Sequence, residues 1–134
     1  MSSKFYNRII LLLTGLVALL VGVSITFAPE LVYASYDVEL DVSSTHMSEI
    51  RGPAGAFIGV ALYLLVSATR ERMIRVGLAV ASVLYLGTAG GRIVSYLADG
   101  EPATSLVWAT VIEIILGSLA LLAMRNEPKI RTVK

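Results

Sequence analysis

The stretch that decides the fold is residues 9–28, IILLLTGLVALLVGVSITFA, which runs for twenty residues without a charge. A helix that crosses a lipid bilayer needs about 20 consecutive, mainly apolar residues. Three further stretches meet the same requirement, at approximately residues 50–69, 76–98 and 103–124. The sequence therefore predicts four membrane-spanning helices that are joined by more polar connections.

The composition agrees with a membrane protein made of one domain, residues 1–134. Hydrophobic residues make up 56% of the chain and charged residues 16%, whereas soluble domains average about 45–50% and about 25%. The formal net charge of +1 provides no basic excess, so we expect no nucleic-acid partner. The absence of cysteine excludes disulfides, thiolate metal ligands and cysteine nucleophiles.

The charges of the connections predict the orientation, because Lys and Arg accumulate in cytoplasmic loops close to membrane spans. Basic residues occur before the first span, between the second and third, and after the fourth: Lys4, Arg8, Arg70, Arg72, Arg75, Arg125, Lys129, Arg131 and Lys134. The other two connections carry carboxylates instead: Glu30, Asp37, Glu39, Asp41, Glu49, Asp99 and Glu101. We therefore expect an all-α, antiparallel four-helix bundle with both termini in the cytoplasm, a multi-pass protein of a bacterial inner membrane.

The longest connection, residues 29–49, is expected to lie at the outer membrane interface. Its stretch ELVYASYDVELDV mixes apolar and acidic residues. Tyr33 and Tyr36 suit the headgroup region, where amphipathic rings collect. A cap over the mouth of the bundle is the simplest interpretation of this segment.

Each span carries a stripe of small residues, and such stripes allow the close backbone approach that holds membrane helices together. They are Gly15, Ala18 and Gly22 in the first span, Gly55 and Gly59 in the second, Gly87 and Gly91 in the third, and Gly117 and Ala120 in the fourth. The stripes predict a compact bundle. Use of one stripe for an oligomer interface stays open.

Two charges lie at membrane depth, Arg92 in the third span and Glu113 in the fourth. At a rise of about 1.5 Å per residue, they lie roughly 10 Å and 16 Å below the outer boundary. A long arginine side chain bridges that difference, so we expect the two to interact directly or through one water. A buried charge in a membrane indicates a functional site by default, although an ion pair that only selects helix neighbours explains the pattern equally well.

Further polar and aromatic residues predict a pocket around this pair that opens toward the non-cytoplasmic side. Arg51 is placed at its mouth, where Glu49, Asp99 or Glu101 are candidate partners. Tyr85, Tyr96 and Trp108 are expected to supply its walls, and a membrane-interface anchor is the simpler role for Trp108. His46 is the only histidine, so no metal cluster is expected. No nucleotide-binding loop or nucleophile elbow is found, and we assign no catalytic residue and no cofactor.

Three stretches, SEIRGPAGAFIGVALYL, GGRIVSYLADGEP and WATVIEIILGSLALL, occur in this order and resemble a family of small bacterial four-span membrane proteins, domain of unknown function (DUF) 4345. The positions that carry the resemblance are Glu49, Arg51, Gly52, Gly55, Gly59, Arg92, Asp99, Gly100, Pro102, Glu113 and Gly117. The resemblance implies a fold and a set of polar positions, but no activity. A more distant similarity connects the chain to DoxX-like four-helix membrane proteins, at the level of the fold.

The leading functional hypothesis is a non-enzymatic module that binds a lipid or another amphipathic molecule, or that serves as an accessory subunit of a membrane complex. Arg92 would anchor an anion or a carbonyl, with Glu113 as its partner and Arg51 as a second positive group. One alternative is an intramembrane enzyme or redox-complex subunit in which Glu113 transfers a proton. Another is a small transporter component that works as a homo-oligomer. The lipid bilayer is the one partner that all three hypotheses share.

Overall fold

A computed structural model describes residues 3–127 of the chain. Their elements are α1 (Ser3–Phe27), α2 (Pro29–Ala34), α3 (Ser44–Thr69), the 3-10 turn η1 (Glu71–Met73), α4 (Ile74–Asp99) and α5 (Thr104–Asn126). Within this part of the chain the secondary structure is entirely helical. The helices α1, α3, α4 and α5 are each long and apolar enough to cross a membrane.

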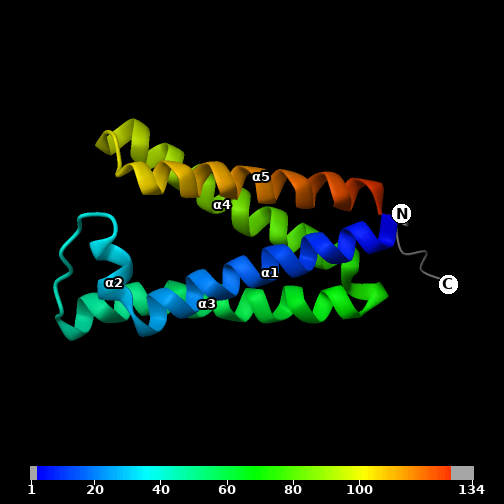
Figure 1. The fold of residues 1–134 in the computed structure, drawn as a ribbon, viewed down its shortest axis with the longest axis horizontal. Coiled ribbons are helices and arrows are strands. Elements are labelled where there is room, and N and C mark those ends of the chain that lie inside the picture. The colour runs from blue at the N-terminus through cyan, green and yellow to red at the C-terminus, as the bar shows by residue number, and fades with distance from the viewer. Residues whose placement is uncertain (1–2, 128–134) are drawn as a thin grey trace.

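The four long helices form two antiparallel hairpins, α1 with α3 and α4 with α5 (Figure 1). The start of α1, the end of α5 and the η1 turn lie at one end of the molecule, and α2 and the α4–α5 turn lie at the other. We call the first the basic end, after Lys4, Arg8, Arg70, Arg72, Arg75 and Arg125. The second is the acidic end, with Asp37, Glu39, Asp41, Glu49, Asp99 and Glu101. The basic residues expected at 129, 131 and 134 lie outside the described residues.

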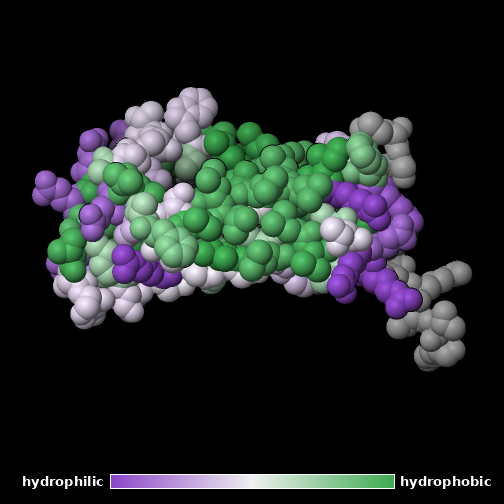
Figure 2. All heavy atoms as spheres, turned by 60° about the horizontal axis from the view of Figure 1, so that its bottom comes forward, coloured by the Kyte–Doolittle hydropathy of each residue, from purple (hydrophilic) through white to green (hydrophobic). Residues whose placement is uncertain are grey.

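The surface between the two ends is apolar. Figure 2 shows a continuous hydrophobic band around the middle of the visible face, with hydrophilic residues gathered at both ends. Large apolar side chains of the long helices, such as Leu20, Val83 and Leu122, are more than half exposed. Such a surface would aggregate in water but suits the hydrocarbon of a bilayer, and the molecule therefore has the construction of a multi-pass membrane protein.

A closely packed hydrophobic core lies in the half toward the basic end. Leu11, Leu64, Ile74 and Leu78 are fully buried there, one or more from each of α1, α3 and α4. Small residues let the backbones approach: a Cβ atom at Gly77 would lie 2.7 Å from Cβ of Ser67. Close approach of this kind supplies the van der Waals contact that drives helix association where lipid removes the hydrophobic contribution.

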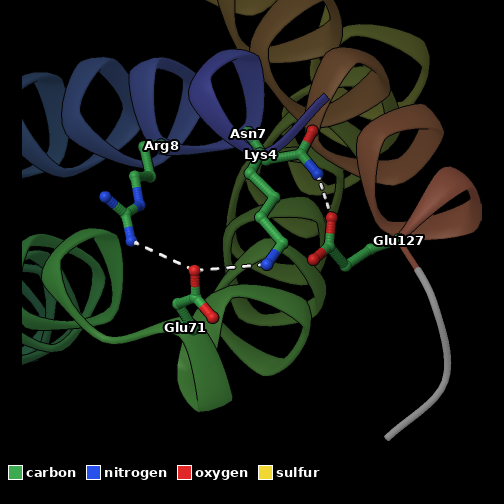
Figure 3. Close-up of polar contacts among 5 residues, drawn as sticks. All are labelled: Lys4, Asn7, Arg8, Glu71 and Glu127. Atoms are coloured by element: carbon green, nitrogen blue, oxygen red, sulfur yellow. Dashed lines mark hydrogen bonds and ion pairs between the residues drawn. The ribbon is translucent and has the colours of Figure 1, made fainter. Parts of the chain in front are cut away.

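Polar contacts close the basic end (Figure 3). Oε1 of Glu71 in η1 lies 3.2 Å from Nζ of Lys4 and 3.9 Å from Nη2 of Arg8. The buried amide of Asn7 donates to the carboxylate of Glu127. Arg75 donates to the backbone carbonyls of Met124 and Glu127, at 3.3 and 2.6 Å. These contacts join the start of α1 and the end of α5 to each other and to the segment formed by η1 and the start of α4.

The glycine stripes behave differently from one helix to the next. Gly15 and Gly22 of α1 pack against α3, and Gly117 of α5 packs against Leu86 of α4. The prediction is wrong for α3 and α4, because a Cβ atom at Gly52, Gly55, Gly59, Gly87 or Gly91 would meet open space. The buried face of α3 runs instead through Ala54, Ala61, Leu64 and Ala68. At about 100° per residue, Gly55 and Gly59 lie about 100° and 140° from Ala54 around that helix.

The connection between α1 and α3 is shorter than the sequence predicts. The helix of the second span begins at Ser44 rather than near residue 50, and α2 occupies six residues that begin with Pro29. Apolar content marks only the part of a helix that lies in the membrane, so the polar first turns of α3 escaped the prediction. Irregular chain remains only between Ser35 and Ser43.

Candidate functional site

Arg92 and Glu113 meet between α4 and α5, as the helical rise predicts. Nε of Arg92 lies 3.1 Å from Oε2 of Glu113, and the two side chains are 33% and 13% exposed. Both of these atoms are fully buried, and their contact does not have the alignment of a hydrogen bond. The contact is therefore an ion pair that neutralises two charges within the apolar part of the molecule.

Glu113 and part of Arg92 face a cavity between the two hairpins, of about 610 Å³, which we call the inter-hairpin cavity. All four long helices line it, and Tyr33, Tyr36 and Val38 of the α1–α3 connection line it as well. Its other lining residues are mostly apolar, among them Val17, Val21, Phe57, Leu106 and Ile112. Tyr85 and Thr88, which lie one to two helical turns before Arg92 in α4, add hydroxyl groups to the lining, and Glu49 adds a carboxylate. The volume falls in the range of about 300–1,000 Å³ that is usual for small-molecule sites.

A second cavity, of about 350 Å³, lies between α4 and α5 near the turn that joins them. We call it the hairpin-end cavity. Ser95, Tyr96, Glu101, Pro102 and Thr110 are among its lining residues. Arg92 and Leu106 line both cavities. The arginine side chain is therefore accessible from both cavities.

Tyr85 of α4 joins the two hairpins at the wall of the inter-hairpin cavity. Its ring is 3% exposed, and its hydroxyl donates a 2.6 Å hydrogen bond to the backbone carbonyl of Thr14 in α1. The same residue lines the inter-hairpin cavity. The hydrogen bond therefore connects α4 of one hairpin with α1 of the other, beside the cavity that Arg92 and Glu113 also line.

The turn between α4 and α5 forms the outer edge of the hairpin-end cavity. Gly100 has a φ of 101°, a backbone conformation that residues other than glycine rarely adopt. Oγ of Ser95 donates a 2.8 Å hydrogen bond to Oδ2 of Asp99. Glu101 and Pro102 follow and line the cavity, so the Asp-Gly-Glu-Pro sequence places a carboxylate at its edge.

Three residues expected in one pocket are placed elsewhere. Arg51 is exposed, lines neither cavity and has no ion pair with any residue between 3 and 127. Arg51 is rotated by about 100° around α3 from its neighbour Ile50. Ile50 lines the inter-hairpin cavity, so the side chain of Arg51 points away from it. Trp108 is 64% exposed on the outside of α5, which suits its simpler role as an interface anchor. Tyr96 lines the hairpin-end cavity rather than the inter-hairpin cavity.

Several residues of the cavities were not predicted as site residues. Thr88 lies one helical turn before Arg92, and that spacing was the signal available for it. Phe57, Tyr33 and Tyr36 enter because α3 and the α1–α3 connection lie across the opening between the hairpins, and no local pattern reports that arrangement. Among the described residues no group of three or more His, Cys, Asp or Glu is arranged to hold a metal ion.

These features define a class: an all-helical protein with four helices long and apolar enough to cross a membrane, and with a charged pair beside two largely apolar cavities. Residues 6–124, nearly the whole chain, match the family described as Domain of unknown function (DUF4345), and the chain belongs to that family. Searches of curated proteins and of solved structures find no match.

Proposed function

We propose that this protein is a non-enzymatic membrane module that binds an amphipathic ligand between its two hairpins. The observation that carries the proposal is the position of Arg92, where a cationic side chain lines two largely apolar cavities. Its Nε is buried against Glu113, yet a third of the side chain stays exposed. The exposed part of a guanidinium supplies N–H donors in a planar fork that suits phosphate, carboxylate or carbonyl oxygens.

The remaining walls suit the apolar part of such a ligand. Val17, Val21, Phe57 and Ile112 surround the inter-hairpin cavity with hydrocarbon. A site with apolar walls and a few convergent polar groups is the usual form of a small-molecule site. A lipid or a quinone-like molecule has the matching division into a polar head and an apolar body.

The contact between Arg92 and Glu113 favours binding over proton transfer. A glutamate that passes protons has to exchange them with a substrate or water, whereas this carboxylate is 13% exposed and lies 3.1 Å from a permanent cation. Service as an accessory subunit of a membrane complex is the second candidate, and the exposed glycines of α3 and α4 favour it because they permit a close approach by another helix. A transporter component would require an oligomer, since four helices enclose little space.

We further propose that the basic end is cytoplasmic and that the protein resides in a bacterial inner membrane. The support is the positive-inside rule together with the separation of basic and acidic residues between the two ends. The chain contains no cysteine, so single-cysteine variants can report sidedness. Ser48→Cys at the acidic end should react with a membrane-impermeant maleimide added outside cells, and Thr69→Cys at the basic end should not.

Native mass spectrometry after extraction in a gentle detergent tests the binding proposal. The wild-type protein should retain an amphipathic adduct of defined mass, and Arg92→Gln should retain much less. Arg51→Gln is the matched control, because Arg51 is an exposed arginine that lines neither cavity. Equal retention by the wild type and both variants would show that the adduct binds elsewhere and would contradict the proposal. The same spectra report stoichiometry and would reveal a partner subunit.

A further inference from the structure

The side chains that line the two cavities include more negative charges than positive ones. Arg92 is the single cation in either lining, and it lines both. Glu49 and Glu113 line the inter-hairpin cavity, and Glu101 lines the hairpin-end cavity. The linings therefore contain three carboxylates and one guanidinium, and Glu113 already pairs with that guanidinium.

This balance disfavours a ligand whose only charge is negative. Such a ligand would gain contact with Arg92 but would gain nothing from Glu49 or Glu101, whose like charges repel it, although weakly because both side chains are exposed. A ligand that carries an acceptor oxygen and also a cationic group would satisfy both signs. An ammonium group offers three donors and suits an exposed carboxylate.

The order of the groups along the bundle agrees with one kind of amphiphile. Glu49 and Glu101 are exposed residues at the acidic end, Arg92 lies deeper, and the apolar walls of the inter-hairpin cavity extend further still to Val17 and Ala18. From water inward, the protein thus presents carboxylate, guanidinium and hydrocarbon. A zwitterionic phospholipid presents ammonium, phosphate and acyl chain in the same order.

We propose that the ligand is a zwitterionic aminophospholipid, held by its phosphate at Arg92 and by its ammonium group at Glu49 or Glu101. This inference rests on the proposed binding function and specifies its ligand. It assigns a role in recognising the headgroup to Glu49 and Glu101.

Two lipids that differ only in the headgroup test the inference. Delipidated protein is titrated with dioleoyl phosphatidylethanolamine or dioleoyl phosphatidylglycerol in detergent, and the bound fraction is measured by native mass spectrometry. An exposed charge pair contributes little, so the wild type should prefer phosphatidylethanolamine by about threefold to fivefold. The double variant Glu49→Gln with Glu101→Gln should lose that preference. Glu39→Gln is the matched control, an exposed carboxylate of the acidic end that lines neither cavity.

The outcomes separate the inference from the proposal beneath it. Equal binding of the two lipids, or a preference for phosphatidylglycerol, by the wild type would overturn the zwitterionic ligand while Arg92-dependent binding stands. A preference for phosphatidylethanolamine that persists in the double variant would overturn the role of the two carboxylates. Binding of neither lipid above the level of Arg92→Gln would contradict both this inference and the proposed function.

Discussion

The two ends of the bundle are built from the same four helices, but they are packed differently. Toward the basic end, Leu11, Leu64, Ile74 and Leu78 are fully buried. Toward the acidic end, residues 90–99 of α4 are all exposed except Arg92, and residues 51–53 of α3 are exposed as well. The two cavities extend into this more open half, where Glu49, Arg92 and Glu101 line them.

The difference shows that apolar character and close packing are separate properties in a membrane protein. Lipid is as apolar as leucine, so helices associate where backbones approach closely or where polar groups join them. The basic end has both, with Gly77 against Ser67 and Arg75 bonded to the end of α5. Toward the acidic end, Gly22 of α1 packs against α3, but the glycines of α3 and α4 meet open space. The ion pair of Arg92 and Glu113 lies beside the cavities.

The largest expected difference in stability is between two glycine-to-valine substitutions, one at a closely packed glycine and one at a glycine that faces open space. A Cβ at Gly77 would lie 2.7 Å from Cβ of Ser67 and 3.0 Å from Cδ2 of Leu11, whereas one at Gly91 would meet nothing within 4 Å. Gly77→Val should therefore lower the free energy of unfolding by about 1–3 kcal/mol. Gly91→Val, on the same helix, should stay within about 0.5 kcal/mol of the wild type. Unfolding in detergent, followed by circular dichroism, measures both, and equal losses would remove the contrast between the two halves.

A smaller effect should come from the ion pair of the open half. Because the Arg92 side chain is a third exposed, we expect a coupling energy of about 1 kcal/mol between Arg92→Ala and Glu113→Gln. The measurement is a double-mutant cycle on unfolding in detergent. Strictly additive losses would mean that the two side chains do not stabilise each other. Packing between the helices, without a contribution from the ion pair, would then hold the acidic half together.

Removal of the hydroxyl group between the hairpins should have a still smaller effect. Tyr85→Phe keeps the ring and deletes the hydrogen bond to the carbonyl of Thr14. Interhelical hydrogen bonds in membranes contribute about 0.6 kcal/mol on average, so a loss of that size is expected. Unfolding curves measure the loss, and Tyr96→Phe is a control, since Tyr96 is exposed at the acidic end. A loss equal to that of the control would place the junction of the two halves elsewhere.

The smallest effect concerns pH at the acidic end. Hydrogen bonds from the hydroxyl and the backbone N–H of Ser43 lower the pKa of Asp41 below its usual value. A carboxylate whose pKa is lower in the folded state stabilises that state at pH values above its unfolded pKa, and this contribution is lost as the pH falls through the folded pKa. Because Asp41 is exposed, the effect on stability should be slight, and an NMR titration is the suitable measurement. Ser43→Ala should raise the pKa of Asp41 toward its ordinary value, and an unchanged pKa would contradict this contact.

The contact between Arg92 and Glu113 could be predicted because it depends on two local facts, helical rise and a short turn between neighbouring helices. The absence of Arg51 and Trp108 from the cavities could not be predicted in the same way. Both lie close in sequence to residues of the cavity linings, and a rotation of about 100° per residue decides which of two adjacent side chains faces inward. Spacing shows which residues share a face, but the neighbouring helices decide which face is buried.

The sequence by itself determined four long apolar helices, the segregation of basic and acidic residues to opposite ends, and the charged pair on adjacent helices. These properties follow from composition and helical periodicity, which act within one helix or between helices that are joined by a turn. The tertiary structure alone decided that the basic half closes while the acidic half opens around two cavities. The reason is physical: helices that are equally soluble in lipid are arranged by the fit of their surfaces and by contacts between residues far apart in the chain, such as Tyr85 with Thr14 and Asn7 with Glu127.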